Sequence, residues 1–244
     1  MEVHAHTHTP RKKWTHYFWE FVMLFLAVFC GFLAEYQLEH KIEKDREKQY
    51  MKSMVEDLKS DTVMLIHNIT QRQQKIMMID SMVNLLSSSS VNERGNEIYY
   101  FGRSISPPTN VFPNDGTIQQ LKSSGNLRLI HNNTISNGIM AYDQKMRNVL
   151  FEMGDEVEIR AEYRLLARKL FKTNVFHQMI ATDKISMPKN NPALYSKDAN
   201  LLNEFIGALQ YFKRVHQSQL VLSGQLLIQA QTLLETIIKE YHLK

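Results

Sequence analysis

A run of apolar residues near the N-terminus constrains this chain more than any other feature. From Tyr17 to Ala34 every residue except Glu20 is apolar or glycine, and aromatic residues flank the run at both ends. A helix of roughly 20 such residues spans a hydrocarbon core about 30 Å thick, and aromatic rings collect at the two interfaces. We therefore predict a transmembrane helix over residues 14–36.

A cleaved signal peptide and a lipoprotein are the alternatives to this anchor. Cleavage after Ala34 requires a small residue two positions earlier, where Phe32 stands. Acylation of Cys30 requires a small residue directly before it, where Phe29 stands. Because both requirements fail, an uncleaved anchor is favoured. The negative mean hydropathy of -0.34 excludes a polytopic membrane protein.

The charges around the span favour one orientation. Arg11, Lys12 and Lys13 precede it, whereas the cations that follow alternate with acids and belong to a large domain. Large domains cross a membrane largely regardless of their charge, so the short basic segment decides. We expect the N-terminus inside and the domain outside.

Small residues and one acid share a stripe of the predicted span. Glu20, Ala27 and Ala34 recur every seven residues, and Gly31 lies on the same stripe. Small residues let helix backbones approach closely, which predicts association of the span with a second span, and Glu20 adds a hydrogen-bonding group or an ion path. In the simpler alternative, Glu20 pairs with His16 or extends to the interface, and the small residues carry no function.

The first 13 residues contain alternating histidines. His4, His6 and His8 lie on one side of an extended chain, a geometry that suits a transition metal. The alternative is a flexible polar tail without metal, and it is favoured because few other ligand residues are nearby.

The rest of the chain is predicted to be mainly helical. Only 9 Gly and 6 Pro occur in 244 residues, which disfavours a turn-rich all-β fold. Residues 37–50 are almost all charged or polar and predict a helical stalk that continues the transmembrane helix. Residues 51–244 form the predicted domain, with heptad spacing in the three segments 51–86, 135–170 and 202–237.

These three series predict long helices of similar length, with Asn132 or Asn133 capping the second and Asp198 capping the third. The fold class is therefore mainly α, an N-terminal transmembrane helix that continues into an antiparallel long-helix bundle or coiled coil. In an up-down-up order, the connection 87–132 is a distal tip and the connection 173–197 returns close to the membrane. The tip contains the aromatic residues Tyr99, Tyr100 and Phe101, which we expect to contact a partner.

A basic stripe ends the second predicted helix. Arg160, Arg164, Arg168 and Lys172 recur every four residues, and the up-down-up order places them near lipid head-groups. The favoured alternative is an ordinary solvated helix face whose cations suit the C-terminal end of the helix dipole. Nucleic acid is not expected, because the net charge is only +4 and no aromatic residues interleave with the stripe.

Six polar residues occupy positions that the heptads assign to the core. They could meet in one buried layer that binds a ligand, or they could set helix register, or they could face solvent where the helices diverge. These residues are Arg72, Glu156, Arg160, His216, Gln219 and Ser223.

No catalytic motif is evident. The chain lacks a Gly-x-Ser-x-Gly element, a phosphate loop, a Cys-x-x-Cys pair and a His-Glu-x-x-His pair, and its single Cys30 lies in the span. We therefore expect a membrane-anchored interaction or scaffold module without catalytic activity or cofactor, which forms homo-oligomers or holds another membrane protein. The alternative is an extracytoplasmic sensor or ligand-binding module that uses the tip or the polar layer.

Two segments carry a family resemblance. The opening MEVHAHTHTPRKKWTHYFWEFVMLFLAVFCGFLAEYQLEHKIEKDREKQYMKSMVEDLKSDT resembles the start of uncharacterised single-span membrane proteins of Bacteroidota, a family defined by a domain of unknown function. The block TIQQLKSSGNLRLIHNNTISNGIMAYDQ is similar to a Leu-x-x-Ser-Gly segment of the same group. The resemblance implies a single-pass protein of the bacterial inner membrane with a helical domain on the periplasmic side, and it implies no activity.

Overall fold

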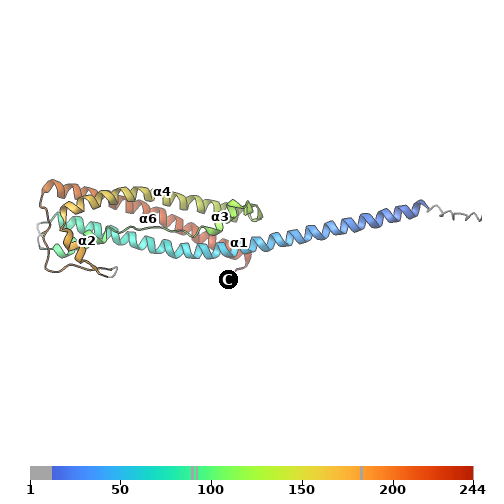
Figure 1. Ribbon diagram of the computed structural model, residues 1–244, viewed down its shortest axis with the longest axis horizontal. Coiled ribbons are helices and arrows are strands. Elements are labelled where there is room, and N and C mark those ends of the chain that lie inside the picture. The colour runs from blue at the N-terminus through green and yellow to red at the C-terminus, as the bar shows by residue number, and fades with distance from the viewer. Residues whose placement is uncertain (1–12, 89–90, 92, 182–183, 244) are drawn as a thin grey trace, which may run out of the picture. The chain divides into compact units, whose positions relative to one another are not determined.

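The computed structural model describes residues 13–88, 91, 93–181 and 184–243 (Figure 1). Within these residues the chain is mainly helical, as predicted, and it divides into two compact units, Met1–Gln49 and Tyr50–Lys244. We call the second unit the helical domain. The helices are α1 (Trp14–Leu86), α2 (Gly95–Ser104), α3 (Gly116–Ser123), the 3-10 helix η2 (Asn126–Leu129), α4 (Asn133–Leu170), α5 (Thr173–Gln178) and α6 (Ala199–Tyr241). The strands β1 (Ile180–Ala181) and β2 (Lys184–Ile185) form an antiparallel pair.

The first unit consists of the N-terminal part of α1 in the residues that the structure describes. Its apolar side chains from Phe21 to Leu33 are exposed almost without exception. Two helices, α1 and α6, are long and apolar enough to cross a membrane by length and composition. They differ in burial, since the apolar stretch of α1 is uncovered, whereas Phe205, Phe212 and Leu226 of α6 lie in the interior of the helical domain.

Three long helices build the helical domain and enclose two apolar cores. Helices α4 and α6 pack closely and run in opposite directions, and α1 contributes buried side chains to both cores beside this pair. One core joins residues 51–65 of α1, residues 135–149 of α4 and residues 226–237 of α6. The second core joins residues 79–86, 163–171 and 205–212 of the same helices.

The predicted up-down-up order is wrong, because α4 runs parallel to α1. Both helices pass from the first core to the second in the direction of the chain, and only α6 runs the other way. The described residues of the connection 173–197 therefore pack against α2 beside the end of α1, and the backbone N–H of Lys172, directly before this connection, donates to the Tyr99 hydroxyl oxygen at 2.8 Å. It lies at the end of the domain opposite Tyr50, not at the membrane-proximal end that the sequence suggested.

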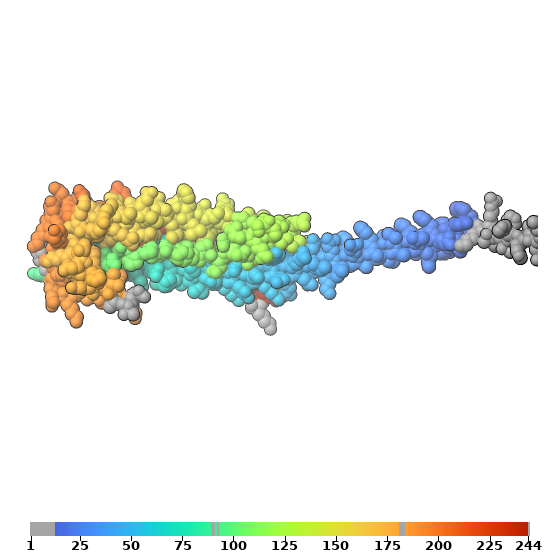
Figure 2. All heavy atoms as spheres, viewed as in Figure 1, coloured from blue at the N-terminus to red at the C-terminus, as the bar shows by residue number. Residues whose placement is uncertain are grey.

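The physical cause is an extended return segment, residues 105–115. It follows α2 and runs back along α1 (Figure 2). As a result, α4 starts beside the first core. Of the described residues of the predicted distal tip 87–132, those of α2 lie at the same end as the second core, residues 105–115 run back along α1, and α3 and η2 lie beside the first core.

Polar side chains of α1 satisfy backbone groups of the return segment and of the first turn of α3. Asp57 and Asp61 accept hydrogen bonds from the backbone N–H groups of Thr117 at 3.2 Å and Asn114 at 2.8 Å. Further along α1, three side chains donate to backbone oxygens of residues 107–110. We call these α1 residues the polar track: Asp57, Asp61, Asn68, Arg72 and Lys75. An extended segment without sheet partners requires such donors and acceptors wherever its backbone is buried against a helix.

Candidate functional site

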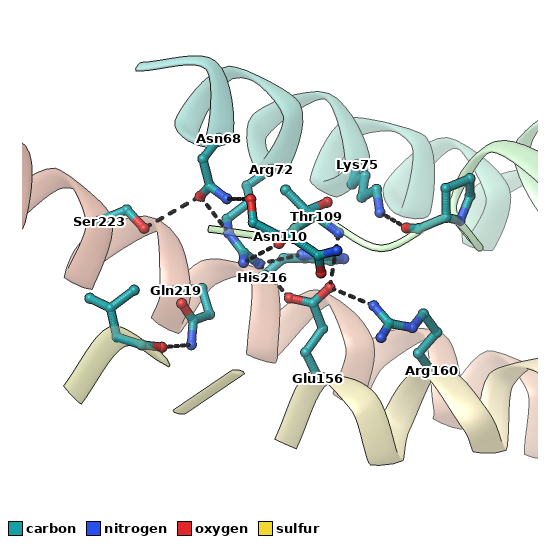
Figure 3. Close-up of polar contacts among 12 residues, drawn as sticks. Asn68, Arg72, Lys75, Thr109, Asn110, Glu156, Arg160, His216, Gln219 and Ser223 are labelled. Atoms are coloured by element: carbon teal, nitrogen blue, oxygen red, sulfur yellow. Dashed lines mark hydrogen bonds and ion pairs between the residues drawn. The ribbon is translucent and has the colours of Figure 1, made fainter. Parts of the chain in front are cut away.

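A layer of polar residues, most of them buried, lies between the two apolar cores. Figure 3 shows the contacts within this layer. On each long helix it occupies the gap between the core residues: 68–75 on α1, 156–160 on α4 and 216–223 on α6. The return segment adds Thr109, which is fully buried. The polar layer, as we use the term, consists of Asn68, Arg72, Lys75, Thr109, Glu156, Arg160, His216, Gln219 and Ser223.

Arg72 is the centre of this layer. Its side chain is fully buried and pairs with Glu156, whose Oε2 lies 2.8 Å from Nη1 of Arg72. The same guanidinium donates to Asn68 Oδ1 at 2.9 Å and to the Thr109 backbone oxygen at 3.0 Å. Arg160 adds a second contact to Glu156, 3.2 Å from Oε1. One arginine thus ties α1, α4 and the return segment together.

His216 completes the layer from α6. Its Nδ1 lies 3.1 Å from Nη1 of Arg72. Arginine is always protonated and can only donate, so Nδ1 accepts and Nε2 carries the ring hydrogen. Burial, and secondarily the positive charges of Lys75, Arg72 and Arg160, lower the pKa of His216 to about 2. The ring is therefore neutral at physiological pH, and it stacks on Phe212 with centroids 4.7 Å apart.

The layer carries more positive than negative charge. Burial is also the main reason why the pKa of Lys75 is lowered to about 8. Its ammonium group donates to the Pro107 backbone oxygen. Three polar atoms of the layer are buried without a hydrogen-bond partner among the described residues: Thr109 Oγ1, His216 Nε2 and Gln219 Oε1.

The six polar core residues predicted from the heptads do meet in this layer. Arg72, Glu156, Arg160 and His216 are joined as described, and Gln219 and Ser223 lie beside them. The sequence analysis missed Asn68, Lys75 and Thr109. Asn68 and Lys75 are polar residues at helical spacing from Arg72, a pattern that could have identified the polar track.

A pocket lined by arginines adjoins the polar layer. It has a volume of about 410 Å³ and lies between α2, α4 and α5. Arg103 of α2 and Arg164 and Arg168 of α4 line it, and the Arg103 guanidinium carbon lies 5.9 Å from the centre of the Phe176 ring. We call it the arginine pocket; its lining residues are Gly102, Arg103, Ser106, Tyr163, Arg164, Ala167, Arg168 and Phe176.

The predicted basic stripe is distributed over three environments. Arg160 belongs to the polar layer, Arg164 and Arg168 line the arginine pocket, and Lys172 precedes α5 as its N-cap residue. The expectation of lipid head-groups rested on a second helix that returns toward the start of the domain. Since α4 ends at the opposite end, that argument no longer holds.

The aromatic group of the predicted tip is only partly available to a partner. Tyr99 is fully buried, which corrects the prediction for this residue, and its hydroxyl donates to the Ala193 backbone oxygen at 3.2 Å. Its ring packs edge-on against Phe171. Tyr100 and Phe101 are half-buried beside the second core.

The predicted span residues lie on the N-terminal part of α1. Glu20, Ala27, Gly31 and Ala34 are all exposed within their unit, and His16 Nε2 lies 3.0 Å from Glu20 Oε1. This pairing is the one that the simpler alternative described.

The candidate metal ligands His4, His6 and His8 lie outside the described residues. Elsewhere in the described ranges, no group of three or more His, Cys, Asp or Glu side chains could hold a metal ion.

No protein-family model, curated protein or solved structure matches this chain at a significant level.

Proposed function

We propose that the protein is a membrane-anchored helical interaction or scaffold module without catalytic activity. The single observation that carries the proposal is α1, an uninterrupted helix of 73 residues. Its N-terminal part exposes a stretch of apolar side chains, and its C-terminal part supplies one wall of both cores of the helical domain. An exposed apolar stretch of this length suits a bilayer, and the absence of a break in α1 ties the anchor directly to the domain.

In this proposal residues 14–36 cross the bacterial inner membrane once and the helical domain lies on the periplasmic side. We also propose that the chain belongs to the family of single-span membrane proteins of Bacteroidota that its opening segment resembles. The partner is a second copy of the chain or another membrane protein, held through the span stripe, through coiled-coil-like contacts or through the domain surface.

Cysteine labelling tests the anchor and its orientation. In a Cys30→Ser background, Gln231→Cys places a thiol at an exposed position of α6. Intact spheroplasts are treated with a membrane-impermeant maleimide, and labelling is expected without permeabilisation. Labelling that requires permeabilisation would place the domain inside, and extraction of the chain from membranes by alkaline carbonate would refute the anchor itself.

Self-association of the span is tested in detergent. Gly31→Leu enlarges the predicted contact stripe and is expected to shift an oligomer toward monomer, because leucine keeps the backbones apart. Val22→Leu is the matched control on the opposite face of the helix. Sedimentation that shows the same mass for the wild type and both variants would remove the stripe from the proposal.

A sensor or ligand-binding module is the second candidate, and one observation favours it. The three unpartnered atoms of the polar layer, on Thr109, His216 and Gln219, are groups that a small polar molecule could satisfy. His216→Phe removes one of them while preserving the aromatic stacking. If the layer holds such a molecule, a metabolite mixture should raise the melting temperature of the wild type and not that of the variant.

A further inference from the structure

Basic side chains outnumber carboxylates in the part of the helical domain that holds the polar layer and the arginine pocket. The polar layer and the arginine pocket together contain six basic side chains, whereas Glu156 is their one carboxylate. Glu156 is already shared between Arg72 and Arg160. The remaining positive charge is concentrated toward the arginine pocket, where Arg164 and Arg168 follow Arg160 at successive turns of α4.

The three pocket arginines have no carboxylate partner, although they lie close together. Arg72, Arg94, Arg147 and Arg160 each pair with a carboxylate. In contrast, no carboxylate of the described residues lies within ion-pair distance of Arg103, Arg164 or Arg168, which share one pocket, and the same holds for the exposed Arg128 and Arg214 outside it. Cations that gather around a cavity without a carboxylate attract an anion from solution.

The donors of the pocket are partly fixed in place. Arg164 donates through Nε to the Ser106 hydroxyl at 3.0 Å and through Nη2 to the Ser106 backbone oxygen at 2.9 Å. These bonds orient its guanidinium and leave Nη1 for a ligand. Arg103 is held over the Phe176 ring. Part of the ordering cost of binding is therefore already met in the free protein.

The shape and lining of the pocket indicate the class of anion. Three guanidinium groups suit a group with two negative charges and several acceptor oxygens better than they suit a single carboxylate. A volume of about 410 Å³ exceeds the needs of a lone inorganic ion. Phe176, Ala167 and Gly102 supply an apolar wall for the remainder of a ligand.

We propose that the arginine pocket binds a phosphate monoester through Arg103, Arg164 and Arg168, with the organic part of the ligand against Phe176. This site is distinct from the polar layer, and the inference depends on neither of the two functions proposed above. The monoester is a soluble metabolite, because Arg164 and Arg168 lie at the end of the domain opposite Tyr50. The head-group of an anionic lipid has the same phosphate chemistry and is the other source that the test distinguishes.

Calorimetric titration with phenyl phosphate tests the site. The full chain is held in phosphatidylcholine nanodiscs at about 0.15 M ionic strength, which suppresses weak surface attraction. Saturable binding of one phenyl phosphate per chain is expected, about ten-fold tighter than binding of benzoate, which has the same ring and one charge less. Equal affinities for the two compounds would overturn the assignment to a phosphate.

Two variants on adjacent positions of α4 provide the control. Arg168→Gln removes a pocket cation, whereas Lys169→Gln removes an equal charge from an exposed residue outside the pocket lining. We expect about a ten-fold loss of affinity in the first variant and less than about a two-fold loss in the second. Equal losses would overturn the pocket as the binding site, and circular dichroism verifies that both variants are folded.

A second arm distinguishes the two sources of the phosphate. Nanodiscs containing phosphatidic acid are compared with phosphatidylcholine nanodiscs for occupancy of the pocket. If phosphatidic acid competes with phenyl phosphate, and does so less in Arg168→Gln, the lipid is the source. If only phenyl phosphate binds, the source is a soluble monoester. If neither phenyl phosphate at concentrations up to about 10 mM nor phosphatidic acid binds, the proposal is overturned.

Discussion

The apolar cores and the polar layer hold the same three helices together by different means. In the cores, residues such as Leu58 and Phe212 remove apolar surface from water, and each contributes roughly 1.5 to 3 kcal/mol. In the layer, Arg72 contributes only as long as its acceptors remain in place. The cores therefore account for stability, and the layer for a defined position of each chain segment.

The difference follows from the cost of burying charge. A buried ion pair recovers its desolvation cost only with good geometry and additional hydrogen bonds, so its net contribution is small. The Arg72 guanidinium has both, because it contacts α1, α4, α6 and the return segment at once. We infer that the layer fixes the register of the return segment along α1, which apolar contacts alone would leave free to slide.

The largest expected effect comes from removing the one carboxylate of the layer. Glu156→Ala leaves the buried Arg72 without its ion partner and should lower the free energy of unfolding by about 3 to 5 kcal/mol. Urea unfolding of the full chain in detergent, followed by circular dichroism, measures this change. Glu158→Ala, an exposed position of the same helix, is the control. A loss below about 1 kcal/mol would contradict a buried pair.

A double variant separates two effects of the polar layer, its effect on the register of the return segment and its effect on the stability of the fold. Arg72→Met with Glu156→Leu removes both charges and should unfold at higher urea than Glu156→Ala alone, because no unpaired charge remains. If the layer fixes register, amide exchange within residues 105–115 should still be faster than in the wild type. Unchanged exchange would assign the register to the apolar contacts instead.

A cavity in the first core is the next test of the comparison. Leu58→Ala removes a fully buried side chain and should cost about 3 kcal/mol. Leu165→Ala is the matched control, since Leu165 is 51% exposed. The distinctive expectation is that the cavity lowers global stability without a selective increase of amide exchange in the return segment. A selective increase would mean that the core also sets the register.

The sequence predicted the core faces of α4 and α6 well. The buried residues of α6 include ten of the positions that the heptad series contains, from Phe205 to Ile237. Asn132 and Asp198 cap α4 and α6 as expected. These predictions succeeded because α4 and α6 pack closely against each other, and close helix pairs impose heptad spacing.

The same reasoning failed on part of α1. The series there placed Thr62, Ile69 and Ile76 in the core, but Asp61, Asn68 and Lys75 are more deeply buried. An extended segment covers this face of α1, and its backbone requires polar partners at positions that a helix partner would fill with apolar ones. Heptad spacing cannot show which kind of partner covers a face, and for the same reason the direction of α4 was missed.

The loss of stability at acid pH also distinguishes the polar layer from the apolar cores, and this loss is expected to be smaller than the losses above. His216 has a pKa lowered to about 2 in the folded chain, against an ordinary value of 6.5. The unfolded chain therefore binds the additional proton below pH 6.5, and stability falls as the pH decreases from there toward 2. At pH 5.5 this loss is about 1.4 kcal/mol relative to pH 8.

His216→Gln isolates that effect. The difference in unfolding free energy between pH 8 and pH 5.5 should shrink by about 1.4 kcal/mol in this variant. Other titrating groups, such as Lys75 and Asp61, change the unfolding free energy with pH in the wild type and in the variant alike. Their contributions therefore largely cancel when the two proteins are compared. His67→Gln, which changes an exposed histidine of α1, is the control. An equal reduction in both variants would show that His216 is not the source of the pH-dependent loss of stability.

The smallest expected effect comes from a single polar contact at the edge of the first core. Tyr142 is buried among apolar residues, and its hydroxyl donates to Asp61 Oδ2 at 2.7 Å. Tyr142→Phe keeps the ring and removes this bond, while Asp61 retains the backbone N–H of Asn114. The expected loss is about 1 kcal/mol, measured by urea unfolding, with Tyr211→Phe at an exposed position as control. Because Asp61 keeps two donors, the backbone N–H and the side-chain amide of Asn114, its carboxylate stays hydrogen-bonded, whereas Arg72 loses its ion partner in Glu156→Ala. A loss as large as that of Glu156→Ala would mean that stability depends on the Tyr142–Asp61 contact as strongly as on the buried Arg72–Glu156 pair.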